Sequence, residues 1–155
     1  MTIAFTVLGD AKPAGSKRAF ALRKGGVLTG RVSVVDACNR SRDWKQQVAS
    51  AARQAYDGPL LTGPLRVTMQ FYRPRPKGHY NAKGELNKKG RESIAPTGRP
   101  DCGKLCRAVD DAITSVVWRD DAQVVAERVT KDWGEPARVE ISIEEVTIEP
   151  QGSNA

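Results

Sequence analysis

Strict alternation of apolar and polar residues between positions 65 and 72 constrains this chain more than any other sequence feature. Every second residue there is apolar: Leu65, Val67, Met69 and Phe71. Successive side chains of a β-strand point to opposite faces of a sheet, so the pattern predicts a strand with one buried and one exposed face. The fold must therefore contain a half-buried sheet.

Two other segments have the apolar spacing of helices. The first runs from about Ser41 to Tyr56, with Ser41 as its N-cap, and Asp57-Gly58-Pro59 ends it. The second begins near Asp101 or Cys102 and runs to about Ser115. Its apolar stripe consists of Leu105, Val109, Ala112, Ile113 and Val116.

Further strands are expected on both sides of these helices. They are residues 2–8, a short hairpin over residues 20–29 around Lys24-Gly25-Gly26, an extended stretch at 32–35, and strands at 124–131 and 138–143. A length of 155 residues suits one domain. We expect an α/β (α+β) domain over residues 1–148, with a mixed sheet of about five strands and two main helices, and a flexible tail at 149–155.

Charge is divided unevenly along the chain. Residues 1–100 hold 19 basic and 6 acidic side chains, whereas residues 101–155 hold 6 basic and 12 acidic ones. The basic part suits a polyanion such as nucleic acid. The alternative is a charge that only keeps the protein soluble, with an acidic C-terminal face.

A long stretch from residue 73 to 100 is rich in Pro, Gly and basic residues and has almost no periodicity. Such a stretch inside a small domain is functional or disordered. It would suit a mobile basic arm that orders on a phosphate backbone, or a solvated loop without a partner. Its basic residues are Arg73, Arg75, Lys77, Lys83, Lys88, Lys89, Arg91 and Arg99.

Five aspartates gather between positions 101 and 121: Asp101, Asp110, Asp111, Asp120 and Asp121. Carboxylates held together repel one another unless a cation joins them. Oxygen ligands of this kind suit Mg²⁺ or Mn²⁺ rather than zinc, and such an ion supports phosphodiester cleavage. The alternative is that Asp101 is only an N-cap, Asp110 pairs with Arg107 on the surface, and Asp120-Asp121 forms a polar turn.

Cysteine and aromatic residues add little. Cys102 and Cys106, with Cys38 and His79, lack the CxxC spacing of zinc sites, so buried thiols and no zinc are expected. We expect His79 to be exposed, or else to contact phosphate, and Trp118 and Trp133 to lie in the core. No apolar run reaches the roughly 20 residues of a membrane span, and the start does not read as a signal peptide.

The last third of the chain resembles a known family. Residues 99–113 (RPDCGKLCRAVDDAI) and 117–125 (VWRDDAQVV) are similar to the signature of RusA-type Holliday junction resolvases, especially phage-borne members. Further similarity lies in residues 12–18 (KPAGSKR) and 71–80 (FYRPRPKGHY). The resemblance covers about residues 3–145. It implies a homodimeric, Mg²⁺-dependent endonuclease that nicks four-way DNA junctions in recombination and repair, inside a bacterial cell.

The resemblance also assigns residues. Asp101 matches the first signature aspartate, Asp121 and its neighbour Asp120 the later pair, and Asp111 the aspartate of an Asp-Ala-Leu motif. Arg107 stands where many relatives have a catalytic lysine. We therefore expect Mg²⁺ (or Mn²⁺) on Asp101, Asp120, Asp121 and Asp111, with Arg107 and Lys104 offsetting charge on the phosphate. Residues expected to contact DNA are Lys12, Lys17, Arg18, Arg73, Arg75, Lys77, Lys88, Lys89 and Arg99.

One position departs from the family pattern. Gly103 occupies the place of the second signature aspartate, so one expected ligand is missing. Asp111 or Asp120 would have to compensate, or the cation would bind more weakly. The alternative function is a junction-binding protein that does not cut. A third is a metal-free scaffold whose acidic face docks a partner.

Overall fold

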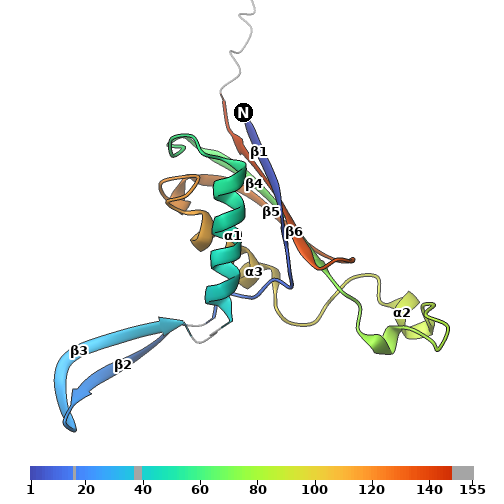
Figure 1. The fold of residues 1–155 in the computed structure, drawn as a ribbon, viewed down its shortest axis with the longest axis horizontal. Coiled ribbons are helices and arrows are strands. Elements are labelled where there is room, and N and C mark those ends of the chain that lie inside the picture. Colours follow the sequence, from blue (N-terminus) through green and yellow to red (C-terminus); the bar gives the residue numbers. More distant parts are fainter. Residues whose placement is uncertain (16, 37–39, 148–155) are drawn as a thin grey trace, which may run out of the picture.

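A computed structural model describes residues 1–15, 17–36 and 40–147, and it has a mixed four-stranded sheet at its centre (Figure 1). The strand order is β1 (Thr2–Leu8), β6 (Arg138–Glu145), β4 (Leu65–Arg73) and β5 (Val124–Trp133). β4 and β5 are parallel, and the other neighbours are antiparallel. The predicted α+β class is confirmed.

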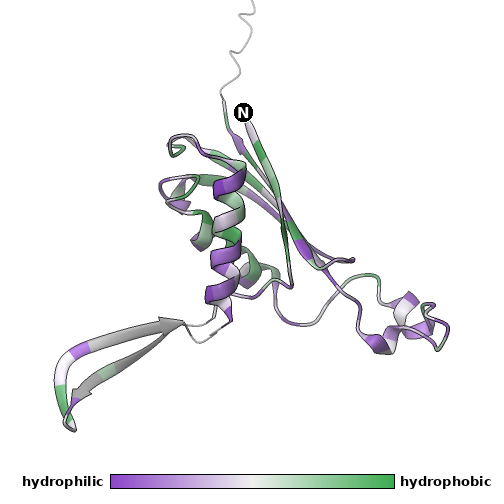
Figure 2. Cartoon of the chain, viewed as in Figure 1, coloured by the Kyte–Doolittle hydropathy of each residue, from purple (hydrophilic) through white to green (hydrophobic). Residues whose placement is uncertain are grey.

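The sheet buries one face, as the alternation predicts. Leu65, Val67, Met69 and Phe71 of β4 are fully buried, and Val139, Ile141 and Ile143 of β6 lie beside them on the same face. Helices α1 (Ser41–Ala55) and α3 (Cys102–Ile113) cover this face (Figures 1 and 2). The apolar stripe of α3 supplies Leu105, Val109 and Ile113 to the core.

The path between β4 and β5 determines where the acidic residues lie. β5 is parallel to β4, so α3 must carry the chain back along the sheet between them. The start of α3 is tied to the last part of β5, because Lys131 Nζ donates to the Pro100 carbonyl at 3.0 Å. The end of α3 therefore lies beside the start of β5.

The N-terminal hairpin is longer than expected. β2 (Lys17–Lys24) and β3 (Val27–Asp36) pair antiparallel and project away from the sheet (Figure 1). The extended stretch expected at 32–35 is part of β3, so the described residues form six strands in two sheets rather than one sheet of about five. Residues 148–155, which include the expected tail, and Cys38 lie outside the described residues.

The basic segment 73–100 is a folded lobe rather than an irregular arm. It contains a 3₁₀ turn, η1 (Lys77–His79), and a short helix, α2 (Lys88–Glu92). The Arg75 guanidinium donates to the carbonyls of Gly90 (2.6 Å) and Ser93 (3.1 Å) and lies 5.4 Å from the Trp133 ring. His79 is buried and makes an edge contact with Trp133. Periodicity did not reveal these contacts because they join loop backbone to single side chains.

Smaller expectations have mixed outcomes. The first helix is confirmed at Ser41–Ala55, but its N-cap is Arg40, and Ser41 is a buried residue of the first turn. Trp118 is fully buried, whereas Trp133 is half-buried. His79 is not exposed, so that expectation is wrong. Among the described residues, no helix combines the length and apolarity that crossing a membrane requires.

Candidate active site

Asp101 is the N-cap of α3. Its Oδ1 accepts the Lys104 N–H at 2.8 Å, as expected of a carboxylate at a helix start. Lys131 Nζ holds the preceding segment through the carbonyls of Gly98 (2.8 Å) and Pro100 (3.0 Å). The N-cap reading of Asp101 is thus correct, and its second oxygen remains available for another role.

A cleft opens beside Asp101. It has a volume of about 390 Å³. Its lining combines the carboxylate of Asp101 with the basic side chains of Arg99 and Lys104, and Pro13 and Pro100 complete it. Arg99 and Lys104 are exposed. This arrangement places one carboxylate among cations, which is suited to a phosphate group with a counterion.

Asp120 and Asp121 lie in the turn before β5, at the other end of α3. Asp120 Oδ1 accepts the Ala122 N–H at 2.9 Å at the start of η2 (Asp121–Gln123). Gln123 fixes the turn: its Oε1 accepts the Asp120 N–H at 2.8 Å, and its Nε2 donates to the carbonyls of Leu61 (2.9 Å) and Gly63 (3.0 Å). Asp121 is exposed at this fixed turn.

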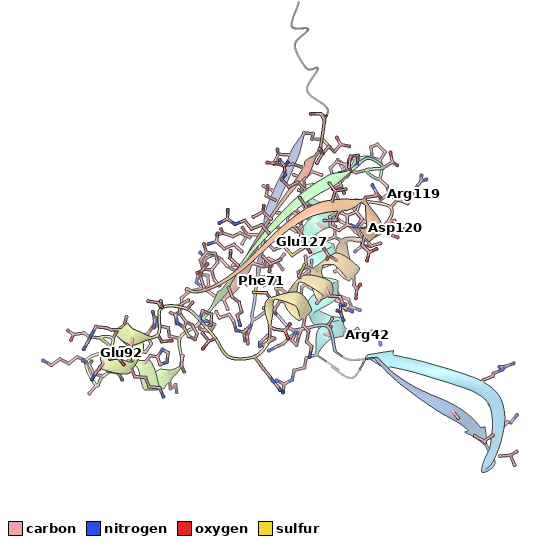
Figure 3. The ribbon with its side chains drawn as sticks, turned by 180° about the vertical axis from the view of Figure 1, so that it is seen from behind. Arg42, Phe71, Glu92, Arg119, Asp120 and Glu127 are labelled. Carbon is pink, nitrogen blue, oxygen red and sulfur yellow. The ribbon has the colours of Figure 1, made fainter. Side chains whose placement is uncertain are left out.

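Three other side chains form a tight cluster next to this turn. Cys106 and Asp110 are one helical turn apart on α3, and Glu127 faces them from β5. One ligand atom from each lies within 4.8 Å of the others, and the Cys106 thiol donates to Asp110 Oδ2 at 3.5 Å. Figure 3 shows Glu127 on β5, with Asp120 and Arg119 at the turn that precedes it. Within the described residues, this is the one group of three potential metal ligands.

Burial dominates the electrostatics of the cluster. Burial, then the charge of Glu127, a hydrogen bond shared with Glu127 and the charge of Asp121 raise the pKa of Asp110 to about 7, while the hydrogen bond from Cys106 lowers it. Burial and the same acidic surroundings raise the pKa of the Cys106 thiol, so it stays protonated. Asp110 Oδ1 is buried and accepts no hydrogen bond from the described residues. Once Asp110 is ionised, this oxygen lacks a cation or a donor among the described residues.

The four aspartates expected to hold the cation do not come together in one chain. Nine residues separate Asp101 from Asp110, which is a rise of about 13.5 Å along α3 at 1.5 Å per residue. Asp121 acts on the pKa of Asp110 and so lies at the far end of the helix from Asp101. Asp111 forms an ion pair with Lys45 of α1 at 3.1 Å.

The expected cationic residues differ in their availability. Arg107 is exposed on α3, as is Lys104 at its start. Lys77, Lys88, Lys89 and Arg99 are also exposed, although Lys88 pairs with Glu92 at 3.9 Å. Arg73 instead pairs with Asp10 at 3.3 Å, as does Lys12 at 3.2 Å, and Arg75 is used within the lobe. Lys17 and Arg18 lie on β2, where only the backbone is described.

Sequence reasoning missed two carboxylates. Asp110 belongs to the predicted group of aspartates, with a surface pair to Arg107 as the alternative, but it is not among the predicted ligands; in the structure it faces Cys106 and Glu127. Glu127 was not considered. Both could have been found from spacing: Asp110 follows Cys106 by one helical turn, and Glu127 precedes Val129 and Lys131 on the same face of an alternating strand.

Comparison with known proteins agrees with the signature. The family model described as Endodeoxyribonuclease RusA matches residues 10–144. The chain is also similar to Uncharacterized protein YqaN of Bacillus subtilis (strain 168), with 34% identity over 145 residues that cover 94% of this chain and 97% of that protein. The chain therefore belongs to the RusA family of endodeoxyribonucleases, the RusA-type Holliday junction resolvases.

Proposed function

We propose that this protein is a Mg²⁺-dependent endonuclease that nicks four-way DNA junctions, with Mn²⁺ as a substitute ion. The observation that carries the proposal is the meeting of carboxylates from α3, β5 and the turn between them, in a chain of the RusA family. The substrate is branched double-stranded DNA, and the setting is the cytoplasm of a bacterial cell, with the gene of phage type.

The residues where α3 ends and β5 begins fit a divalent cation. The buried and unpaired Asp110 Oδ1 and the mutual repulsion with Glu127 and Asp121 are both relieved by a positive charge. A bound divalent ion supplies the Lewis-acid chemistry that phosphodiester hydrolysis needs. Asp101, Asp120 and Asp121 would hold it, while Asp111 contributes only if its ion pair with Lys45 opens.

Two exposed cations of α3 would act on the substrate itself. Arg107 lies one residue after Cys106, and Lys104 borders the cleft beside Asp101. Both would offset negative charge on the phosphate as the bond breaks. Arg107 brings a planar guanidinium where many relatives have the compact ammonium of lysine, so it would bind the phosphate through two nitrogens.

We further propose that the working unit is a homodimer whose sites are shared. Asp101 and Asp121 lie at opposite ends of α3, so one chain alone does not gather them. In the described residues β5 pairs only with β4, and its other edge is open. Antiparallel pairing of two β5 edges would set the start of one strand, with Asp121, beside the end of the other, with Lys131 and the attached Asp101.

The grip on DNA would come from two separate regions. The first is the lobe around α2, whose residues are mainly hydrophilic (Figure 2) and include the exposed Lys77, Lys88 and Lys89. The second is the N-terminal part with Lys12, Lys17 and Arg18. Arg99 at the cleft lies between the lobe and the acidic helix. Arg73 and Arg75 would act indirectly, by fixing the base and the interior of the lobe.

A second candidate function follows from Gly103. A chain that lacks one ligand of the family could bind junctions without cutting them. The wild-type protein and the Asp121→Asn variant would then bind a junction with the same affinity, in Mg²⁺ or in EDTA. Metal-dependent cutting that Asp121→Asn abolishes contradicts this alternative.

The experiment that tests the main proposal uses a synthetic four-way junction and a linear duplex of the same sequence. Wild-type protein should nick the junction in Mg²⁺ and leave it intact in EDTA, with little cutting of the duplex. Asp121→Asn should bind the junction with unchanged affinity and lose nicking. Absence of nicking in both Mg²⁺ and Mn²⁺ would refute the proposal.

A further inference from the structure

The cluster of Cys106, Asp110 and Glu127 has no place in the RusA signature as this chain displays it. The positions that the resemblance assigns to aspartates are 101, 103, 111, 120 and 121, and position 103 holds a glycine here. Asp110 and Glu127 are additional carboxylates, and the fold brings them together from different elements within 4.8 Å. Their arrangement therefore needs an explanation of its own.

The first step concerns the unpaired oxygen. Asp110 Oδ2 accepts the Cys106 thiol, whereas Oδ1 is buried without a hydrogen-bond donor among the described residues. Buried carboxylate oxygens are usually paired, because removing them from water without a partner is unfavourable. A carboxylate oxygen of Glu127 lies within 4.8 Å of Asp110, so two acidic groups face each other here. A bound cation would satisfy the oxygen and compensate the charges together.

The second step concerns the number of ligands. Gly103 removes one carboxylate from the family set, at the start of α3. Asp110 and Glu127 add two at its end, next to the turn that carries Asp121. In the shared site proposed above, this end of α3 in one copy meets the start of α3 in the other. Asp110 and Glu127 would then supply the carboxylate that is missing at position 103.

We propose that Asp110 and Glu127, together with Asp121, bind the divalent cation of this protein and replace the carboxylate that Gly103 lacks. This inference rests on the proposed metal-dependent nuclease function. The ligands are oxygen atoms, which Mg²⁺ and Mn²⁺ prefer. Cys106 is a positioning residue: its buried thiol stays protonated and holds Asp110 Oδ2, which leaves Oδ1 for the ion.

The test measures binding of Mn²⁺ alone to the full-length protein by isothermal titration calorimetry, without DNA. Asp110→Asn and Glu127→Gln should each weaken Mn²⁺ binding by about tenfold or more, since each removes a charged ligand. Asp132→Asn is the matched control, because Asp132 lies on β5 and accepts from Gln70 outside the cluster. Its Mn²⁺ affinity should equal that of the wild type.

Thermal unfolding in EDTA separates ligand loss from misfolding. Asp110→Asn relieves repulsion in the ion-free protein, so its melting temperature should equal or exceed that of the wild type. Cys106→Ser keeps a donor at this position and should bind Mn²⁺ nearly as well as the wild type. Unchanged Mn²⁺ affinity in both carboxylate variants would overturn the inference, and so would an ultraviolet cadmium–thiolate band that Cys106→Ser abolishes.

These outcomes are distinguishable from failure of the proposed function. Cluster-dependent Mn²⁺ binding without junction cutting would leave the inference standing and refute the nuclease. If the protein cuts junctions and its Mn²⁺ affinity is unchanged by Asp110→Asn and by Glu127→Gln, the inference alone is refuted. A wild-type protein that binds no Mn²⁺ would overturn the inference directly.

Discussion

Burial and neighbouring carboxylates make Asp110 a weak acid. In the folded chain Asp110 keeps its proton up to a pKa of about 7, whereas in the unfolded chain it ionises near the ordinary value of 3.8. The folded state therefore binds more protons between these two values. The free energy of unfolding should fall as the pH rises from about 4 to about 7.

The measurement is urea denaturation in EDTA at several pH values between 4 and 8. Asp110→Asn should flatten the fall in this window, because an amide does not titrate. Glu127→Gln should reduce the fall in part, since the charge of Glu127 is the second cause of the raised pKa. A wild-type protein whose stability rises steadily over the same window would contradict this account of Asp110.

Gly103 has room for the carboxylate that the family signature places there. A Cβ at this position would lie 3.6 Å from Asp101 Oδ1, which is ordinary van der Waals contact. Gly103→Asp should raise Mn²⁺ affinity and nicking, and it should stabilise the helix start by about 0.5–1 kcal/mol. Gly103→Ala is the control, which should gain helix stability while its nicking stays at the wild-type level. Equal nicking by both variants would show that residue 103 is not a ligand position.

At the scale of elements, the turn before β5 depends on one amide side chain. Gln123 accepts the N–H groups of Arg119 and Asp120 and donates to the carbonyls of Leu61 and Gly63. Gln123→Ala removes these bonds from four backbone groups, of which the carbonyls of Leu61 and Gly63 are partly buried. It should lower stability by about 1–3 kcal/mol and reduce nicking by displacing Asp121.

Circular dichroism and the junction assay together check this expectation. Gln70→Ala is the control, because Gln70 makes one hydrogen bond to Asp132 on the sheet and none in the turn. It should cost little stability and no nicking. Wild-type nicking by Gln123→Ala at a temperature where it is fully folded would contradict a positioning role for the turn.

Elements were predictable where one pattern decided them. The alternation at residues 65–72 and the stripe of Leu105, Val109 and Ile113 are encoded in consecutive residues, and both correspond to observed elements. The lobe between β4 and α3 was not predictable, because it depends on Trp133, which lies 40 residues beyond Ser93. Trp133 donates to the Ser93 carbonyl, and the Arg75 guanidinium lies over its ring. Contacts of that kind depend on the tertiary fold.

The candidate site was likewise predictable only in part. The family signature identifies Asp101 and Asp121, but only the three-dimensional path of α3 shows that they lie at opposite ends of the helix. The signature contains nothing about Asp110 and Glu127, because neither occupies a signature position. Their meeting depends on the register of β5 against β4, which pairs Glu127 with Val67.

At the scale of the whole molecule, the division of charge along the chain becomes a division in space. The carboxylates of residues 110–127 gather at the end of α3, while the exposed lysines Lys77, Lys88 and Lys89 lie on the projecting lobe (Figure 1). A homodimer would present two acidic sites and two basic lobes about one axis. This symmetry matches that of a four-way junction.

Mixing two inactive variants tests this account most directly. Asp101→Asn and Asp121→Asn should each fail to nick a four-way junction in Mg²⁺ when assayed alone. After unfolding and refolding together in equal amounts, half of the dimers are mixed, and each mixed dimer has one intact shared site. The mixture should recover roughly a quarter of wild-type nicking, as expected for a two-fold dimer. No recovery, with mixed dimers verified by mass spectrometry, would contradict a shared metal site.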